Sequence, residues 1–129
     1  MNRMEIRYAS GDDIRRWYEE SGKEYPGYSM RAVTAEHDGK LMGLAGVYYQ
    51  RGAPPVAFSE MLPEMVNHKK VIVKVTRMVM AMIENKKNLT LAMCEGDNGK
   101  EFCKKLGFDV SHIVPGKGSV MVWKSCRTS

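Results

Sequence analysis

The feature that most constrains the fold is an apolar run followed at once by a short helix that ends at a glycine. Residues 89–94 read Leu-Thr-Leu-Ala-Met-Cys, a pattern typical of a buried strand. In the polar turn that follows, Asp97 or Asn98 can cap a helix by accepting hydrogen bonds from its free N–H groups. Gly107 can adopt the left-handed backbone that ends such a helix. The pattern therefore predicts a strand, a tight turn and one short helix packed on a sheet.

The N-terminal half predicts a strand, a capped helix and a β-hairpin. Ser10 can cap a helix, with Asp13 as its reciprocal partner three positions later, and Gly22 can end it. Asp38 and Gly39 both tolerate positive φ, so the pair predicts a tight hairpin between two strands. The strand-like runs of the whole chain are residues 4–8, 31–35, 41–50, 56–61, 89–94 and 119–123.

These elements predict the order βαβββαβαβ in a single domain spanning residues 1–129. Residues 71–83 carry apolar side chains on several faces, so this helix should be central and well covered. It connects strand 56–61 to strand 89–94, which should therefore pair in parallel after a right-handed crossover. The expected class is α/β (α+β), with a mixed, mostly antiparallel central sheet and helices on both faces.

Composition excludes several classes of protein. The 129 residues are 43% hydrophobic and 27% charged, with a net charge of +5, and no apolar run is long enough to span a membrane. The first ten residues lack the apolar core of a signal peptide. Three cysteines without a Cys-x-x-Cys spacing indicate reduced thiols, and we expect a cytoplasmic protein without a bound metal.

Residues 96–108 and the order of elements resemble the GNAT superfamily of N-acetyltransferases. In that family an Asn-rich turn leads into a helix that ends in Leu-Gly-Phe, which is Leu106-Gly107-Phe108 here. The resemblance covers nearly the whole chain, with the second helix of the family reduced to the loop around Tyr25 and Tyr28. It implies an enzyme that transfers an acetyl group from acetyl-CoA to a primary amine on a small molecule or protein.

The sequence departs from the family where the pyrophosphate of acetyl-CoA should bind. The family's loop carries an Arg or Gln followed by glycines, whereas residues 63–72 contain neither glycine nor arginine. In one interpretation the helix N-terminus still binds the pyrophosphate and basic side chains supply charge; in the other the site is lost. Under the first, the resemblance implies that the cofactor is bound by Met61, Leu62, His68, Lys69, Lys70, Val71, Asn98 and Lys104, the first two through their backbone.

The resemblance also implies candidates for the two proton transfers. Glu60 is the candidate general base, and it alternates with Phe58 and Leu62, so it should share whichever face these residues bury. Cys103 occupies the position of the family's acid tyrosine, and its thiol could protonate the departing CoA. Free cysteine is also among the most buried residue types, which favours a packing role for Cys103.

Tyr25 and Tyr28 are the expected acceptor contacts, whereas Trp17 is expected in the core.

The competing hypothesis is a non-catalytic GNAT-fold binding protein that has lost the cofactor loop. The short form also resembles small acetyltransferase-like accessory proteins of tailed bacteriophages. We expect no nucleic-acid partner, because the lysines are not interleaved with aromatic residues. Residues 120–123 are a candidate edge strand for a homodimer.

Overall fold

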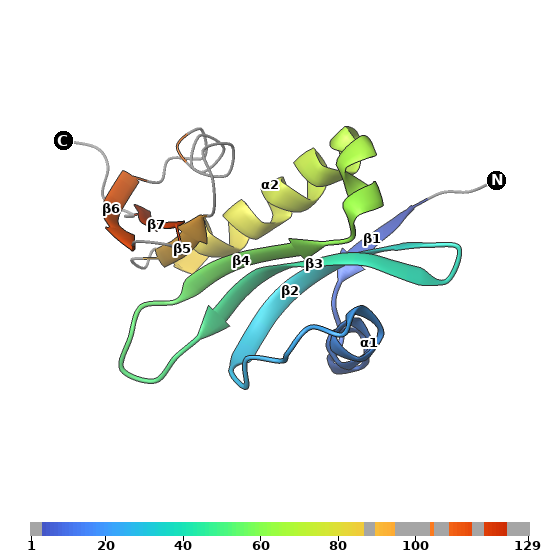
Figure 1. The fold of residues 1–129 in the computed structure, drawn as a ribbon, viewed down its shortest axis with the longest axis horizontal. Helices are drawn as coiled ribbons and strands as arrows, with labels where there is room; N and C mark the ends of the chain where they lie inside the picture. The colour runs from blue at the N-terminus through green and yellow to red at the C-terminus, as the bar shows by residue number, and fades with distance from the viewer. Residues whose placement is uncertain (1–3, 87–89, 95–103, 105–108, 115–117, 124–129) are drawn as a thin grey trace.

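A seven-stranded sheet with a helix on each face makes up most of the described chain (Figure 1). The computed structural model describes residues 4–86, 90–94, 104, 109–114 and 118–123. The strands lie in the order β1-β2-β3-β4-β5-β7-β6. The elements are β1 (Glu5–Tyr8), α1 (Gly11–Ser21), β2 (Ser29–His37), β3 (Lys40–Tyr49), β4 (Val56–Met61), the 3₁₀ helix η1 (Pro63–Asn67), α2 (Lys69–Lys86), β5 (Thr90–Cys94), β6 (Asp109–Val114) and β7 (Gly118–Trp123).

Local signals in the N-terminal half are confirmed. The Ser10 hydroxyl accepts from the Asp13 N–H at 3.1 Å, and the Asp13 carboxylate accepts from the Ser10 N–H at 3.0 Å, as a capping box requires. Gly22 ends α1 with φ of 74°. In the β2–β3 hairpin, Asp38 and Gly39 have φ of 52° and 79°, so this turn uses the two residues that tolerate positive φ.

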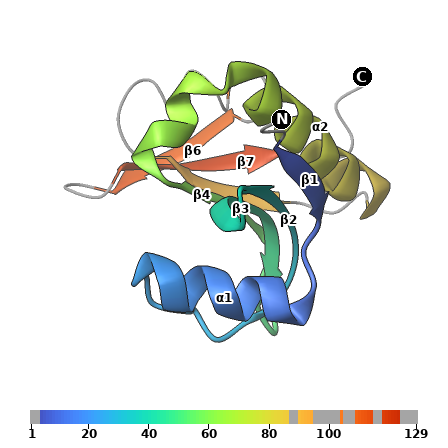
Figure 2. The same cartoon turned by 90° about the vertical axis from the view of Figure 1, so that its right-hand side faces the viewer.

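The two faces of the sheet bury different helices (Figure 2). On one face, α2 packs Val79, Met82 and Ile83 against apolar side chains of β2, β3 and β5. On the other face, α1 packs Trp17 and Tyr18 against β2 and β3. Helices on both faces of a mostly antiparallel sheet are the predicted architecture.

The strand β4 differs along its two edges. It pairs antiparallel with β3 over six positions, from Tyr48↔Val56 to Gly43↔Met61. It pairs in parallel with β5, as the crossover predicts, but only at Val56↔Leu91 and Ala57↔Ala92. Beyond Ala57 the β5 side of β4 has no strand partner within the described chain. The sheet is therefore splayed between β4 and β5.

The C-terminal part corrects two predictions. Residues 109–114 form β6, which the predicted order lacks, so the order gains one strand. The sequence pattern did not indicate this strand because it contains the polar residues Asp109, Ser111 and His112. The strand forms because it pairs antiparallel with β7. The strand β7 consequently lies between β5 and β6, and the proposed edge at residues 120–123 is wrong because residues 120–122 are paired with both neighbours.

The connection into α2 and the helix predicted before Gly107 also differ from the expectations or lie outside the described residues. The connection between β4 and α2 contains η1, and α2 begins two residues before the predicted helix. The short helix before Gly107 lies outside the described residues except for Lys104, which is helical and exposed.

Within the described chain, no helix is long and apolar enough to cross a membrane, and no three potential metal ligands gather.

Candidate active site

Glu60 lies on β4 and points to the α1 face of the sheet. It shares this face with Phe58 and Leu62, as the alternation predicts, since both pack against the cluster around Trp17. Trp17 donates from its indole Nε1–H to Glu60 Oε1 at 3.2 Å, and Tyr18 donates from its hydroxyl to the same oxygen at 3.0 Å. Two adjacent residues of α1 therefore fix one oxygen of the carboxylate.

The second oxygen of Glu60 is left for other partners. Within the described chain, Oε2 accepts no hydrogen bond. Burial, and then the neighbouring Glu60 carboxylate, raise the pKa of Tyr18 well above its ordinary value. Tyr18 consequently stays protonated and remains a donor. This arrangement leaves Oε2 to accept a proton while Oε1 holds the carboxylate in place.

Further aromatic side chains pack in two sets, one that includes Tyr18 and one that includes Phe58. Tyr25 packs edge-on against Tyr18, with ring centres 5.3 Å apart, and its hydroxyl donates to the Tyr28 carbonyl at 2.8 Å. Tyr28 stacks on Tyr48 at 5.4 Å, and Tyr48 contacts Phe58 at 5.8 Å. Of the two tyrosines predicted to contact the acceptor, Tyr25 is in ring contact with Tyr18, a hydrogen-bond donor to Glu60, and Tyr28 belongs to a second set of ring contacts that ends at Phe58.

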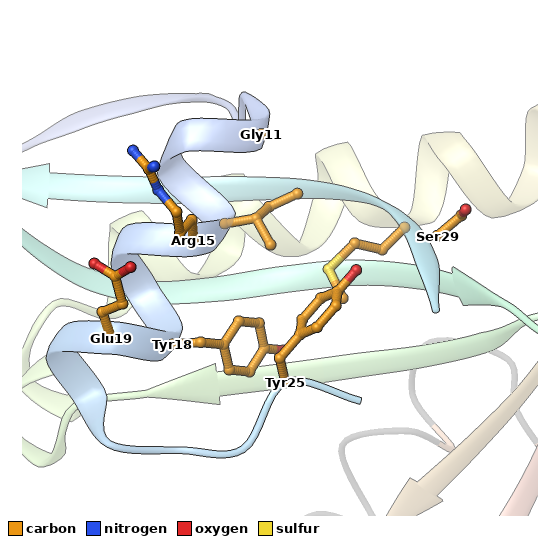
Figure 3. A pocket seen from close by; sticks show the side chains of 8 residues that line it. Gly11, Arg15, Tyr18, Glu19, Tyr25 and Ser29 are labelled. Carbon is orange, nitrogen blue, oxygen red and sulfur yellow. The ribbon is translucent and has the colours of Figure 1, made fainter. Parts of the chain in front are cut away.

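A hollow of about 610 Å³ opens beside α1, and we call it the α1 hollow (Figure 3). Tyr18 and Tyr25 form part of its wall, so Tyr18 both lines the hollow and donates a hydrogen bond to Glu60. Its lining residues are Gly11, Ile14, Arg15, Tyr18, Glu19, Tyr25, Ser29 and Met30.

The open edge of β4 presents backbone groups next to Glu60. Leu62 donates its N–H to the Met42 carbonyl at 2.9 Å, so alternate residues of β4 point their N–H and C=O groups toward β3. Ser59 and Met61 therefore point theirs toward the splay. The Leu62 carbonyl also accepts from the Met65 N–H at 2.9 Å, so both backbone groups of Leu62 have partners within the chain, and its predicted contact with the pantetheine arm stays a prediction. For Met61, whose backbone groups point toward the splay, the role in binding the pantetheine arm stays a prediction.

The start of α2 brings four of the predicted cofactor residues together. Ile72 donates its N–H to the His68 carbonyl at 3.1 Å, which makes this the first hydrogen bond of the helix. The N–H groups of Lys69, Lys70 and Val71 precede that bond and therefore lack an acceptor within the helix. Both lysine side chains are exposed, and the His68 ring lies 6.2 Å from that of His37 in the hairpin.

Comparison with known proteins gives the fold. No family model and no curated protein matches the sequence. Among solved structures, Escherichia coli ElaA is similar over 96% of this chain and 100% of its own, with a TM-score of 0.68 and 11% identity. The PaiA N-acetyltransferase of Thermoplasma acidophilum, solved with coenzyme A, is similar over 95% and 99%, with a TM-score of 0.63 and 16% identity. The ribosomal-protein-S18-alanine N-acetyltransferase of Escherichia coli is similar over 98% and 97%, with a TM-score of 0.61 and 10% identity.

This chain has the GNAT fold. The splay between β4 and β5 and the start of α2 are where the GNAT resemblance implies the cofactor, and they lie at one end of β4. Of the remaining predicted site residues, Cys103 and Asn98 lie outside the described residues.

The role of α1 in this GNAT-fold site was not predicted from the sequence. Trp17 was assigned to the core, and it is 1% exposed, yet its indole N–H is a donor to Glu60. Buried Trp and Tyr side chains usually find a hydrogen-bond partner, and this tendency is the one signal that could have linked α1 to a buried carboxylate.

Proposed function

We propose that this chain is an N-acetyltransferase that transfers an acetyl group from acetyl-CoA to a primary amine. The observation that carries the proposal is the juxtaposition of Glu60 with the open edge of β4. A carboxylate with one fixed oxygen and one open oxygen lies beside backbone groups that have no strand partner within the described chain. A general base next to an extended binding edge suits transfer from a linear cofactor to an amine.

In this mechanism Glu60 accepts a proton from the acceptor amine at Oε2, directly or through a water molecule. Trp17 and Tyr18 keep the carboxylate oriented by holding Oε1. Acetyl-CoA supplies the thioester that the amine attacks. Most of the rate gain then comes from holding amine and thioester together in a fixed geometry. Cys103 is the candidate proton donor to the leaving thiolate, with packing under the last helix as its alternative role.

The residues of the splay fit an extended, anionic cofactor. The N–H and C=O groups of Met61 would pair with the pantetheine arm. The free N–H groups at the start of α2, together with His68, Lys69 and Lys70, would bind the pyrophosphate. Basic side chains would thus replace the close backbone approach that glycines allow. Asn98 and Lys104 are further candidates for cofactor contact from the last helix.

The acceptor would enter past Tyr25, which is in ring contact with Tyr18, and past Tyr28, whose carbonyl accepts from the Tyr25 hydroxyl. We further propose that residues 1–129 act as one domain and that the protein works in the cytoplasm with reduced cysteines. No nucleic-acid or membrane partner is part of this proposal.

A second candidate function is binding without catalysis on the same fold. The observation that favours it is the absence of glycine from residues 63–71, the segment that leads into α2. Side chains on every residue of this segment could keep phosphates away from the helix N-terminus. Under this alternative Glu60 only anchors α1 to the sheet.

Calorimetric titration with acetyl-CoA separates the two candidates, with desulfo-CoA as the control for the sulfur. The proposed enzyme should bind acetyl-CoA in the micromolar range. Lys70→Glu should weaken binding about tenfold, as expected for reversing one charge near phosphates. Lys74→Glu, one turn further along α2, is the matched control and should change binding far less. Absence of binding at millimolar acetyl-CoA would favour the non-catalytic alternative.

A further inference from the structure

We propose that the α1 hollow binds the neutral, apolar tail of the acceptor, which makes the acceptor a primary monoamine and not a di- or polyamine. This inference rests on the proposed function for the amine end and on the hollow for the tail. It deepens the function by naming the substrate class.

The interior of the hollow is apolar. Ile14, Met30 and the rings of Tyr18 and Tyr25 line it, and its volume of about 610 Å³ is large enough for a small organic group. Alkyl or aryl carbons lose contact with water in such a site, and their burial favours binding in proportion to the apolar area covered. The lining therefore selects for an uncharged hydrocarbon tail.

The charged residues at the hollow do not provide a site for a second ammonium group. Arg15 pairs with Asp12 at 2.7 Å, and Glu19 lies one turn away on the same helix, so charges of opposite sign stand next to each other. Figure 3 shows the charged ends of Arg15 and Glu19 turned away from Tyr25. A terminal ammonium in the hollow would lose its hydration and meet thioether and ring carbons instead, which is costly.

Tyr18 connects the hollow to the reacting end. Its ring lines the hollow while its hydroxyl lies 3.0 Å from Glu60 Oε1. The hollow is therefore bordered by a residue that orients the proposed base, and an amine placed at Glu60 would extend its tail along Tyr18 into the hollow. Tyr25, which is in ring contact with Tyr18 and tied to the Tyr28 carbonyl, forms the wall that the arm passes.

The test compares n-hexylamine with hexamethylenediamine, which has the same six carbons and carries a second, charged amino group at the far end. We expect a KM at least about tenfold lower for n-hexylamine. Hydrophobic pockets discriminate to about this extent between substrates that differ in one small group. Equal KM values, or a preference for the diamine, would overturn the proposal.

Two variants locate the preference in the hollow. Ser29→Trp places an indole at its rim and should remove the difference between the two amines. Val73→Trp, on the exposed outer side of α2, is the matched control and should keep the difference. If Ser29→Trp fails to fold, Tyr25→Ala serves instead, because Tyr25 is 48% exposed and its removal opens the wall. A preference that survives the loss of the rim or wall would contradict the assignment.

Binding without acetyl-CoA separates this inference from the proposed function. Calorimetric titration with n-hexylamine alone should show binding that Ser29→Trp abolishes. If no amine is acetylated but this binding is seen, the enzyme assignment fails and the hollow remains a site for apolar amines. If amines are acetylated without regard to their tails, the enzyme assignment holds and the inference about the hollow fails.

Discussion

The two edges of β4 have opposite properties although they belong to the same six residues. The edge toward β3 is paired along its whole length, and Gly43 allows the two strands to approach closely there. The edge toward β5 is paired at two positions and then open. The closed edge supplies stability, whereas the open edge leaves backbone groups and the Glu60 carboxylate available to a ligand. This difference separates residues that should matter for folding from residues that should matter for activity.

The largest effect is expected from Glu60→Gln at the open edge. The amide oxygen of glutamine can still accept from Trp17 and Tyr18, so the fold should be retained, but the amide cannot accept the amine proton. We expect kcat/KM to fall on the order of 100-fold or more, with little change in the free energy of unfolding. Steady-state kinetics and chemical denaturation measure the two quantities.

Glu64→Gln is the matched control for that substitution, since Glu64 is an exposed carboxylate of η1 that pairs with Lys40. Its activity should equal that of the unchanged protein. Full activity in Glu60→Gln would sink the assignment of Glu60 as the base and leave it a structural anchor of α1.

At the closed edge, Gly43→Ala should reduce stability. A Cβ at position 43 would lie 2.8 Å from the Glu60 carbonyl oxygen, which belongs to the backbone and cannot swing aside. We expect a loss of about 3 kcal/mol in the free energy of unfolding, the upper part of the range for overpacked sites. Gly11→Ala, where a Cβ meets nothing within 4 Å, is the control and should cost nothing measurable.

The local and the long-range parts of the structure differ in how far the sequence predicts them. Ser10 with Asp13, and Asp38 with Gly39, were predictable because each pair acts within a few residues of backbone. The strand β6 was missed because its polar residues are held by a partner strand, which propensity does not describe.

The candidate site shows the same division. The position of Glu60 on the α1 face follows from strand alternation with Phe58. Its hydrogen bonds to Trp17 and Tyr18 span 43 and 42 residues, and nothing in the local pattern of either segment specifies that contact. The partners of the Leu62 backbone on β3 and η1 are likewise not specified by any local pattern.

A smaller effect is expected from the ion pair that ties α1 to β1, far from the open edge. Arg7 forms two hydrogen bonds with the buried Asp13 carboxylate, at 2.7 and 3.1 Å, and lowers the pKa of Asp13 to about 2 from 3.8. Since the pKa is lower in the folded state, the stabilisation is complete above about pH 4 and is lost as the pH falls toward 2. This shift corresponds to about 2 kcal/mol.

Asp13→Asn should therefore be less stable than the unchanged protein at neutral pH, and the difference should shrink between pH 4 and pH 2. Denaturation at several pH values measures it. Asp12→Asn removes an exposed partner of Arg15 and should change stability by less than about 1 kcal/mol at any pH. A difference for Asp13→Asn that does not depend on pH would contradict the ion-pair explanation.

The smallest effect is a contrast among amide protons within β4 itself. Glu60 and Leu62 direct their N–H groups toward β3, whereas Ser59 and Met61 direct theirs toward the open edge. Amides without a partner exchange with solvent more readily than paired ones, so Ser59 and Met61 should exchange at least about tenfold faster. Hydrogen exchange followed by NMR resolves the alternation residue by residue.

Added acetyl-CoA should slow exchange at Met61 and leave Leu62 unchanged, because only Met61 has a free N–H to offer the pantetheine arm. Equal protection at all four residues would mean that the splay is closed in solution, and the separation between a folding edge and a binding edge would no longer hold.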